Sequence, residues 1–263
     1  MSKLIYDNIT DVLPNIDFSN LKNKRILITG ASGLVGVYMM SCIERFVEKN
    51  NLSVWCWINN KLGRQFESLF ENCVVIHGDI TDNTNYSVLP RFDVIIHAAG
   101  YGQPGKFLED KVKTIKLNTD STIELFKLLN EDGKFLFVST SELYNGLDQT
   151  NIAEEQIGSS NTDHPRASYI EGKRCGEAIC YAHKDLGYDV KIARLSLAYG
   201  PGTKRNDKRV LNSLIQRGIQ EDNIKLMDGG SAIRTYCYVS DVVEMLWNIV
   251  LHGKHTVYNV GGK

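Results

Sequence analysis

The sequence predicts an α/β fold in which a doubly wound parallel sheet is followed by a smaller C-terminal lobe. Short apolar runs alternate with amphipathic stretches along most of the 263 residues, and this alternation is typical of parallel strands joined by helices on both faces of a sheet. The run 25–29 ends in a glycine-rich turn that opens an amphipathic stretch at 34–49, and the run 53–58 completes a βαβ unit. Past Pro201 the alternation becomes irregular, which predicts the separate lobe.

The remaining elements follow in chain order. Residues 1–23 mix polar and apolar side chains and predict a short helix and a turn. The further apolar runs of strand length predict strands at 73–77, 92–97, 134–138 and 190–193. Helical periodicity predicts helices at 112–129 and 169–186. Within the C-terminal lobe we expect helices at 208–219 and 241–251 and strands at 224–227 and 256–260.

Composition and charge exclude several classes of protein. The formal net charge is −1 and the basic residues are dispersed along the chain, so the sequence lacks a basic footprint for nucleic acid. No stretch approaches the roughly 18 apolar residues of a membrane span, and the N-terminus lacks a signal-peptide layout. The six cysteines show neither CxxC pairs nor zinc spacings. We expect a cytoplasmic protein with no metal site and no nucleic-acid or membrane partner.

A glycine-rich turn, Gly30-Ala31-Ser32-Gly33-Leu34-Val35-Gly36, follows the first strand and opens the first helix of the sheet. In a Rossmann-type dinucleotide site the first glycine permits the tight turn, the second lets the backbone approach a pyrophosphate, and the third lets the helix pack on the strand. The positive end of the helix then faces the phosphates. We expect dinucleotide contacts from Gly30, Ser32, Gly33, Leu34, Val35 and Gly36. The alternative is a turn that serves helix packing alone.

Polar side chains also follow the fifth strand. Thr140, Ser141 and Glu142 come at its carboxyl end, where doubly wound sheets bind ligands. A hydroxyl there can orient a substrate hydroxyl, and a carboxylate can move a proton; the alternative is that these residues only cap the strand. Tyr169 and Lys173 are four residues apart on a predicted helix and share one face. An ammonium near a phenol favours the phenolate, so this pair could bring the tyrosine pKa from about 10 toward neutrality.

Taken together, these motifs resemble the extended short-chain dehydrogenase/reductase family. The turn has the spacing GxxGxxG, and the tyrosine and lysine follow more than a hundred residues later. Asp79 resembles the adenine-contacting aspartate of the family; alone it would be interpreted as a turn cap, and His97 as a packing residue. The resemblance implies that the cofactor site also includes Asp79, Ile80, His97, Ala98, Ala99, Gly100, Asn118, Ser139, Tyr169 and Lys173.

The Thr140-Ser141-Glu142 segment resembles two subfamilies, the UDP-glucuronate decarboxylases and the GDP-mannose 4,6-dehydratases. The dTDP-glucose 4,6-dehydratases carry aspartate at the place of Ser141, and simple 4-epimerases usually lack the glutamate. Further segments resemble the decarboxylases, namely Pro165-Arg166, Glu171-Gly172-Lys173-Arg174, Ala193-Arg194-Leu195, Tyr199-Gly200-Pro201, Asn206–Val210 and Arg234–Asp241. The resemblance covers the chain from about Lys24 to Gly262 and is closest to the decarboxylases.

One departure concerns the choice between NAD and NADP. Where family members that use NAD place an acid on the ribose 2′-hydroxyl, this chain has Asn59-Asn60-Lys61, with Arg64 beyond. Loss of the carboxylate removes repulsion of a 2′-phosphate, and the two cations could attract it, so NADP stays open. Asparagine can still hydrogen-bond a ribose hydroxyl, and the nearest subfamily favours NAD as the cofactor.

An anionic sugar nucleotide needs cations for its diphosphate. The resemblance implies Arg209 and Arg234 for this role and Tyr199 as a further substrate contact; without it, each arginine would be interpreted as a surface ion-pair residue. Family members usually dimerise through two helices, which implies a homodimer formed by 112–129 and 169–186.

Three segments are expected on this basis. Residues 1–23 form an N-terminal extension, 24–200 the dinucleotide-binding domain with Tyr169 and Lys173, and 201–263 a substrate-binding lobe that is interleaved with it. Family members typically continue some tens of residues beyond the strand at 256–260, so we expect the lobe to be incomplete in this chain.

The resemblance implies a reaction that oxidises C4 of a nucleotide-linked hexose transiently. Tyr169, Lys173 and Thr140 would act at C4, and Ser141 and Glu142 at C5 and C6. If the sugar is a uronate, C6 leaves as CO₂; if C6 bears a hydroxyl, Glu142 removes the C5 proton and water leaves. Epimerisation and a non-catalytic dinucleotide-binding module are further alternatives, because a fold does not fix a function.

Overall fold

The computed structural model describes residues 3–59, 61–220, 224, 229–230 and 233–262. Seven parallel strands form the central sheet in the order β3-β2-β1-β4-β5-β6-β9. Their bounds are β1 Arg25–Thr29, β2 Ser53–Ile58, β3 Val74–His77, β4 Phe92–His97, β5 Leu129–Thr140, β6 Asp189–Leu195 and β9 Val257–Val260. The predicted α/β fold with a doubly wound parallel sheet is therefore confirmed. The strand order reverses between β1 and β4, the place where such sheets bind ligands.

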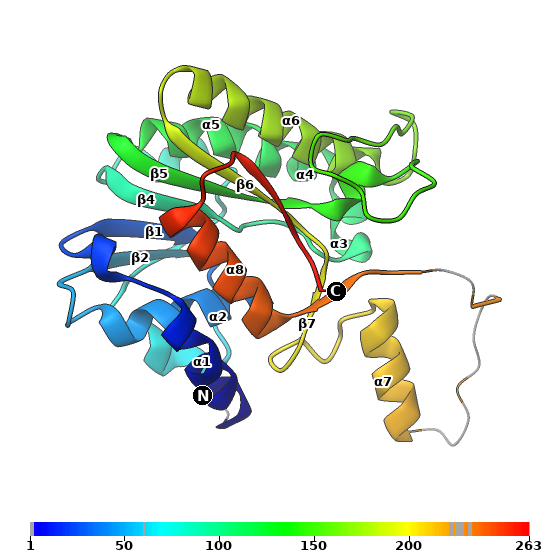
Figure 1. Cartoon of the computed structure of the whole chain (residues 1–263), viewed down its shortest axis with the longest axis horizontal. Coiled ribbons are helices and arrows are strands. Elements are labelled where there is room, and N and C mark those ends of the chain that lie inside the picture. Colours follow the sequence, from blue (N-terminus) through cyan, green and yellow to red (C-terminus); the bar gives the residue numbers. More distant parts are fainter. Residues whose placement is uncertain (1–2, 60, 221–223, 225–228, 231–232, 263) are drawn as a thin grey trace.

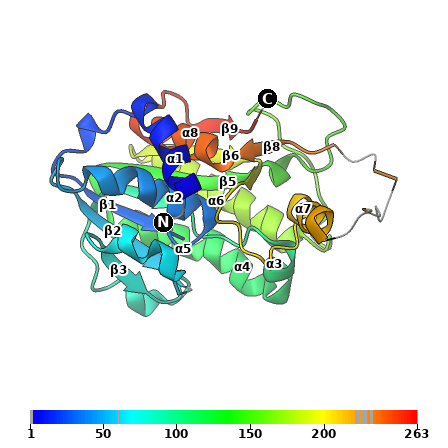
Figure 2. The same ribbon diagram turned by 90° about the horizontal axis from the view of Figure 1, so that it is seen from below.

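Helices cover both faces of the sheet (Figures 1 and 2). One layer contains α1 (Lys3–Val12), α2 (Leu34–Ile43) and α8 (Val239–His252), and the other contains α4 (Lys111–Asn118), α5 (Asp120–Lys127) and α6 (Ala167–Asp185). Alternation along β1 serves both layers, because Ile26 and Ile28 join the core under α2 and α8, whereas Leu27 joins the core under α5 and α6. The sheet is thus buried on both sides, as its nearly continuous apolar strands predict.

The expected helix at 112–129 is interrupted. It ends as α4 at Asn118 and restarts as α5 at Asp120. Asn118 Nδ2 donates to the Thr114 carbonyl, and Thr119 Oγ1 donates to the Ile115 carbonyl. Such side-chain bonds to the preceding turn bend helices. The strand expected at 134–138 is longer than predicted, since β5 runs from Leu129 to Thr140 with an irregularity in its register against β4.

Two elements of the segment 201–263 complete the main layers. Helix α8 packs against α2, and β9 forms the seventh strand of the sheet beside β6. Outside the sheet lie α7 (Val210–Gln220) and a two-stranded sheet of β7 (Leu197–Tyr199) and β8 (Tyr236–Tyr238); Figure 1 shows α7 apart from the sheet layers. The strand expected at 224–227 lies outside the described residues except for Ile224. The role of this segment as a substrate-binding lobe stays a prediction.

The N-terminal segment contains the predicted short helix, α1. Its residues Ile5 and Ile9 are buried in the core that α2 and α8 share. Asn8 Nδ2 donates to the Tyr238 hydroxyl at 2.8 Å, which ties α1 to β8. Within the described part of the chain, no helix combines the length and the apolar character needed to cross a bilayer.

Candidate active site

The glycine turn between β1 and α2 is shaped by close backbone contacts. Gly30 has φ +68°, and a Cβ there would lie 2.7 Å from the Ala98 carbonyl oxygen. A Cβ on Gly36 would lie 2.3 Å from the Gly30 carbonyl oxygen. Gly33 N-caps α2 without a side-chain cap, so the first amides of the helix are left to a ligand. Side chains at Gly30 and Gly36 would fill this turn, and the open α2 N-terminus fits a dinucleotide pyrophosphate.

His97 supports the neighbouring segment from inside the sheet. Its ring is fully buried, with Nδ1 2.9 Å from Thr29 Oγ1 and Nε2 3.2 Å from the Leu117 carbonyl oxygen. Burial, and next the nearby Lys173, lower the pKa of His97 to about 3. Thr29 Oγ1 in turn accepts the Ala99 amide at 3.1 Å. The neutral ring therefore fixes the backbone at Ala98, Ala99 and Gly100 rather than presenting its own side chain to a ligand.

Asp79 forms a small polar cluster after β3. Its Oδ1 accepts the amide and the hydroxyl of Thr81 at 2.9 and 2.8 Å, and its Oδ2 pairs with Lys113 of α4. Burial opposes ionisation, but the bonds from Lys113 and Thr81 outweigh it and keep the pKa of Asp79 below its ordinary value. Ile80 beside it is buried, and its carbonyl accepts the Tyr86 hydroxyl. Lys113 is a member of this cluster that the sequence pattern did not single out.

The end of β2 carries the residues that bear on NAD against NADP. Asn59 follows β2 directly and is exposed, as are Lys61 and Arg64. Asn60 lies outside the described residues. Because Lys61 and Arg64 are exposed and make no contact with the described residues that settles their role, binding of a 2′-phosphate by them stays a prediction.

Tyr169 lies at the carboxyl edge of the sheet, near the start of α6. The Thr140 hydroxyl hydrogen-bonds its phenol, and the Phe107 ring stacks on it with centroids 4.7 Å apart and planes 9° apart. Lys173, one turn further on, is buried and donates from Nζ to the Val138 carbonyl at 2.6 Å. A Cβ on Gly100 would lie 3.6 Å from that Nζ. Lys173 therefore adjoins Gly100 in the segment after β4.

The expected pKa effect of Lys173 on Tyr169 is wrong for the described chain. Burial raises the pKa of Tyr169, whereas the Thr140 hydrogen bond and the charges of Arg166 and Arg209 lower it without cancelling that effect. Burial likewise lowers the pKa of Lys173 to about 8, against the opposing charge of Glu177. Desolvation disfavours the charged form of either group, so further positive charge is needed to form the phenolate.

Ser141 and Glu142 begin the short 3₁₀ turn Ser141–Tyr144 after β5. The Glu142 amide donates to Thr140 Oγ1 at 3.2 Å, and its carboxylate Oε1 lies 2.7 Å from Arg166 Nη2. The Arg166 guanidinium also lies over the Phe107 ring, 5.5 Å from its centroid. Thr140, Glu142 and Tyr169 are thus brought together, with Arg166 as a partner to which the sequence pattern assigned no role.

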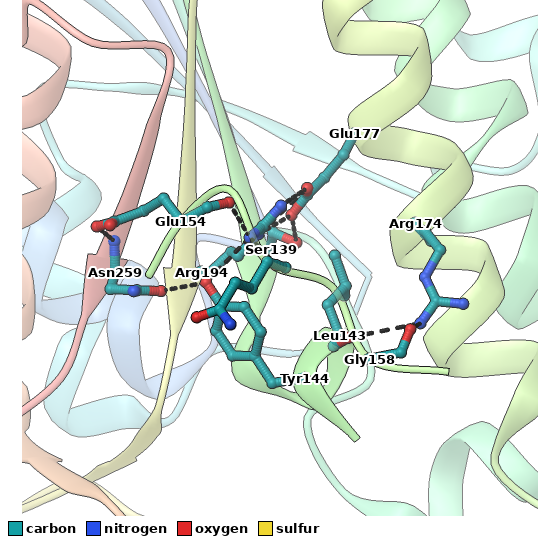
Figure 3. A network of polar contacts seen from close by, with 10 residues as sticks. Ser139, Leu143, Tyr144, Glu154, Gly158, Arg174, Glu177, Arg194 and Asn259 are labelled. Atoms are coloured by element: carbon teal, nitrogen blue, oxygen red, sulfur yellow. Dashed lines mark hydrogen bonds and ion pairs between the residues drawn. The ribbon is translucent and has the colours of Figure 1, made fainter. Parts of the chain in front are cut away.

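A buried ion pair lies one turn after Lys173 (Figure 3). Arg194 Nη2 is 2.7 Å from Glu177 Oε2, and the two side chains are 3% and 4% exposed. Ser139 Oγ donates to Glu177 Oε1 at 2.5 Å. The Ser139 hydroxyl therefore faces this pair. The cofactor contact predicted for Ser139 would have to come from its backbone. Arg194 Nη1 donates further bonds to the Tyr144 hydroxyl and to the carbonyls of Glu154 and Gln156.

The same network secures the segment after Glu142. Asn259 of β9 accepts the Tyr144 hydroxyl at 2.6 Å through its side chain, and its backbone amide donates to the Glu154 carboxylate at 2.9 Å. Arg174 donates to the carbonyls of Leu143 and Gly158. The spacing of Glu177, four residues after Lys173, is the one sequence signal that could have singled out this pair.

The three residues predicted to contact the substrate, Arg209, Tyr199 and Arg234, do not form one cluster around Tyr169. Arg209 makes a two-pronged contact with buried Asp207, with Nη2 2.7 Å and Nε 3.0 Å from Oδ2, and its charge acts on Tyr169. Tyr199 is partly exposed and packs edge-on against Tyr238. Arg234 is exposed and donates to the carbonyl of Ile233. Arg209 therefore adjoins the tyrosine, although its guanidinium is already engaged.

The glycine turn and the tyrosine cluster meet at the carboxyl edge between β1, β4 and β5, an arrangement that defines a dinucleotide-dependent enzyme class. The chain belongs to the NAD dependent epimerase/dehydratase family, whose model matches residues 26–261. NAD is the cofactor of this family, in agreement with the preference drawn from the sequence, and the turn at Gly30–Gly36 fits it.

Relatives and solved structures agree with this membership. The chain is 30% identical to UDP-glucuronic acid decarboxylase 1 of Xenopus tropicalis over 97% of its own length, and it spans 60% of that protein. It is 30% identical to UDP-glucuronic acid decarboxylase 6 of Arabidopsis thaliana over 91% of its length and 69% of that protein. Epimerase Mth375 of Methanothermobacter thermautotrophicus has the same fold, with TM-score 0.78, 21% identity and coverage of 96% and 75%.

A second solved structure, the Bordetella bronchiseptica enzyme WbmF in complex with NADH, gives TM-score 0.73 at 22% identity. The match covers 94% of this chain and 74% of WbmF. At such identities the likeness extends to the fold alone.

Proposed function

We propose that the chain acts on a nucleotide-linked hexose through transient oxidation at C4, and that its substrate is UDP-glucuronate, which it decarboxylates. The observation that carries the proposal is the Tyr169 phenol, hydrogen-bonded to Thr140 and one helical turn from buried Lys173. The curated relatives named UDP-glucuronic acid decarboxylase support the choice of substrate.

In the first step Tyr169 accepts the proton of the C4 hydroxyl while Thr140 holds that hydroxyl in place. NAD, when bound at the Gly30–Gly36 turn, would supply the acceptor for the C4 hydride and the positive charge of the nicotinamide ring. Arg166 and Arg209 lower the pKa of the phenol only in part, so the positive charge that the nicotinamide ring would add is needed to offset the burial that keeps it protonated.

In the second step the oxidised uronate is a β-keto acid, so the C5–C6 bond breaks, C6 leaves as CO₂, and the C4 ketone receives the electron pair of the broken bond. The resulting enolate is protonated at C5. Glu142 and Ser141 occupy the turn directly after Thr140 and are assigned to this part of the sugar. Return of the hydride to C4, with the proton from Tyr169, closes the cycle.

A 4,6-dehydratase of the GDP-mannose type is the second candidate. A carboxylate beside Thr140 could remove the C5 proton of a sugar whose C6 bears a hydroxyl. However, Glu142 is paired with Arg166 at 2.7 Å, which engages the carboxylate that this reaction needs as a base. The pairing favours decarboxylation.

Incubation with NAD and each of UDP-glucuronate, GDP-mannose and dTDP-glucose tests the proposal, with product masses as the readout. We expect loss of CO₂ from UDP-glucuronate. Loss of water from GDP-mannose instead would establish the dehydratase, and an unchanged mass for every sugar would contradict both.

The homodimer expected from the sequence is also part of the proposal. Helices α4 and α6 pack side by side, and Val112 and Ile115 of α4 remain exposed at 67% and 42%. An apolar stripe of this kind suits a second copy of the same face. Ile115→Glu is expected to convert a dimer to a monomer in light scattering, whereas Ile219→Glu on exposed α7 leaves the mass unchanged. A monomeric wild-type chain would contradict the assignment.

The cytoplasmic location stays a prediction.

A further inference from the structure

Arg166 connects the two elements that carry the proposed catalytic residues, namely the turn with Glu142 and the helix with Tyr169. It is the N-cap residue of α6, three positions before Tyr169. Its Nη2 reaches Glu142 on the turn after β5, and its guanidinium plane lies over Phe107, the ring that stacks on Tyr169. Its charge acts on the Tyr169 phenol. A side chain in this position is close to both the C4 end and the C5–C6 end of a sugar held by Tyr169.

One donor of Arg166 is unused. Its Nε is buried, and within the described residues that N–H has no hydrogen-bond partner. A buried donor without an acceptor costs free energy, so such a group is expected where a ligand supplies the acceptor. The guanidinium offers its donors in a planar fork that matches the two oxygens of a carboxylate.

The other cations near Tyr169 are already engaged. Arg209 contacts both oxygens of buried Asp207, and Lys173 donates to the Val138 carbonyl at 2.6 Å. Of the three described cations discussed at this site, Arg166 alone combines a partly exposed side chain with an orphan donor. It is therefore the group best suited to receive a second anion beside Glu142.

We infer that Arg166 binds the C6 carboxylate of a nucleotide-linked uronate and thereby selects uronates over sugars with a neutral C6 group. This inference rests on the proposed function, which supplies the carboxylate. The carboxylate accepts the Nε donor and shares the guanidinium with Glu142. When CO₂ leaves, the second anion is lost from Arg166 and only the Glu142 pair remains.

A neutral C6 hydroxymethyl group cannot replace this acceptor with the same strength. A site built to hydrogen-bond a group discriminates strongly against a ligand that lacks it, because its buried donor stays unpaired. Arg166 is thus a specificity-determining residue.

Calorimetric titration with UDP-glucuronate and with UDP-glucose tests the inference on the wild-type chain, Arg166→Gln and Arg166→Lys. Arg166→Gln is expected to weaken binding of UDP-glucuronate by about 10- to 100-fold, the size of a charge-assisted hydrogen-bond pair. Binding of UDP-glucose should change by less than about threefold. Arg166→Lys keeps the charge without the fork and should lie between wild type and Arg166→Gln.

Two further variants separate a direct contact from a general loss of charge. Glu171→Gln removes a carboxylate that pairs with Arg174 elsewhere on α6 and should bind both sugars like wild type. Arg45→Gln removes an arginine that lies over Tyr6 on the α1 side of the molecule and should bind both sugars like wild type.

Equal weakening of both sugar nucleotides in Arg166→Gln, or no weakening of either, would overturn the inference while wild-type CO₂ release upheld the proposed function. A wild-type chain that neither binds UDP-glucuronate nor releases CO₂ from it would overturn the proposed function, and the inference with it.

Discussion

Ser139 donates a hydrogen bond of 2.5 Å from its Oγ to the Oε1 of Glu177, and this bond joins the end of β5 to helix α6. Ser139 directly precedes Thr140, and Glu177 lies one turn after Lys173, so the bond spans the two elements that carry the catalytic groups. Lys173 itself donates to the Val138 carbonyl of β5, so the bond between Ser139 and Glu177 is a second link that sets the relative position of Thr140 and Lys173.

Glu177→Gln is expected to destabilise the chain by about 3–5 kcal/mol, because it leaves the charge of buried Arg194 without its partner. The free energy of unfolding in urea measures the cost. Glu171→Gln, on the same helix, removes the carboxylate that pairs with Arg174 at a more exposed site and should cost less than about 1 kcal/mol. If the two variants lost similar amounts of unfolding free energy, burial of the Glu177–Arg194 pair would not make it more stabilising than the exposed pair.

Tyr169→Phe is expected to reduce turnover of the substrate by at least about 100-fold, the lower range for loss of a general acid-base group. The affinity for NAD should change little. Tyr181→Phe removes a hydroxyl from an exposed tyrosine of the same helix and should retain wild-type turnover. Undiminished turnover in Tyr169→Phe would rule out the tyrosine as the acid-base group.

Acid should weaken the chain through His97. The native pKa of about 3 lies below the ordinary value of 6.5, so between these values the unfolded chain binds more protons and stability falls as pH falls. Between pH 6.5 and 4 the wild type should lose about 3 kcal/mol relative to His97→Gln. Urea unfolding across this range measures the difference. His77→Gln, at the exposed end of β3, should follow the wild-type curve; parallel curves for His97→Gln would contradict the burial effect.

Gly36→Ala should weaken NAD binding by about 5- to 150-fold, since about 1–3 kcal/mol of steric strain falls on the turn that meets the pyrophosphate. Its Cβ would lie 2.3 Å from the Gly30 carbonyl oxygen, which backbone movement alone can relieve. Gly105→Ala in α3 (Pro104–Glu109) has no heavy atom within 4 Å of the new Cβ and serves as the control. NAD titration compares the two, and equal affinities would show that the turn tolerates a side chain.

Much of the sheet was predictable because its signals are local. Strands β1, β2 and β4 have the predicted bounds, since each is an apolar run closed by turn residues. The place of α8 and β9 in the main layers was not predictable, because a helix or strand pattern in the sequence does not show which other elements it packs against. The break at Asn118 depends on side-chain bonds to the preceding turn.

The candidate site divides in the same way. The glycine turn and the Tyr169-Lys173 pair carry fixed spacings and could be recognised in the sequence. The engagement of Arg209 by Asp207 and the pairing of Arg166 with Glu142 depend on side-chain directions that periodicity does not give. The pKa of Tyr169 was predicted in the wrong direction because the sequence shows the neighbouring lysine but not the desolvation of the phenol.

Arg194 has a consequence for ligand binding. Together with Arg174 and Asn259 it fastens the chain from Leu143 to Gly158 to the body of the protein, through half-buried hydrogen bonds from the two arginines and an exposed one from Asn259. That stretch is ordered by internal contacts alone, so a ligand meeting the adjoining turn would not have to freeze it. The entropy cost that induced-fit loops subtract from affinity is expected to be small here.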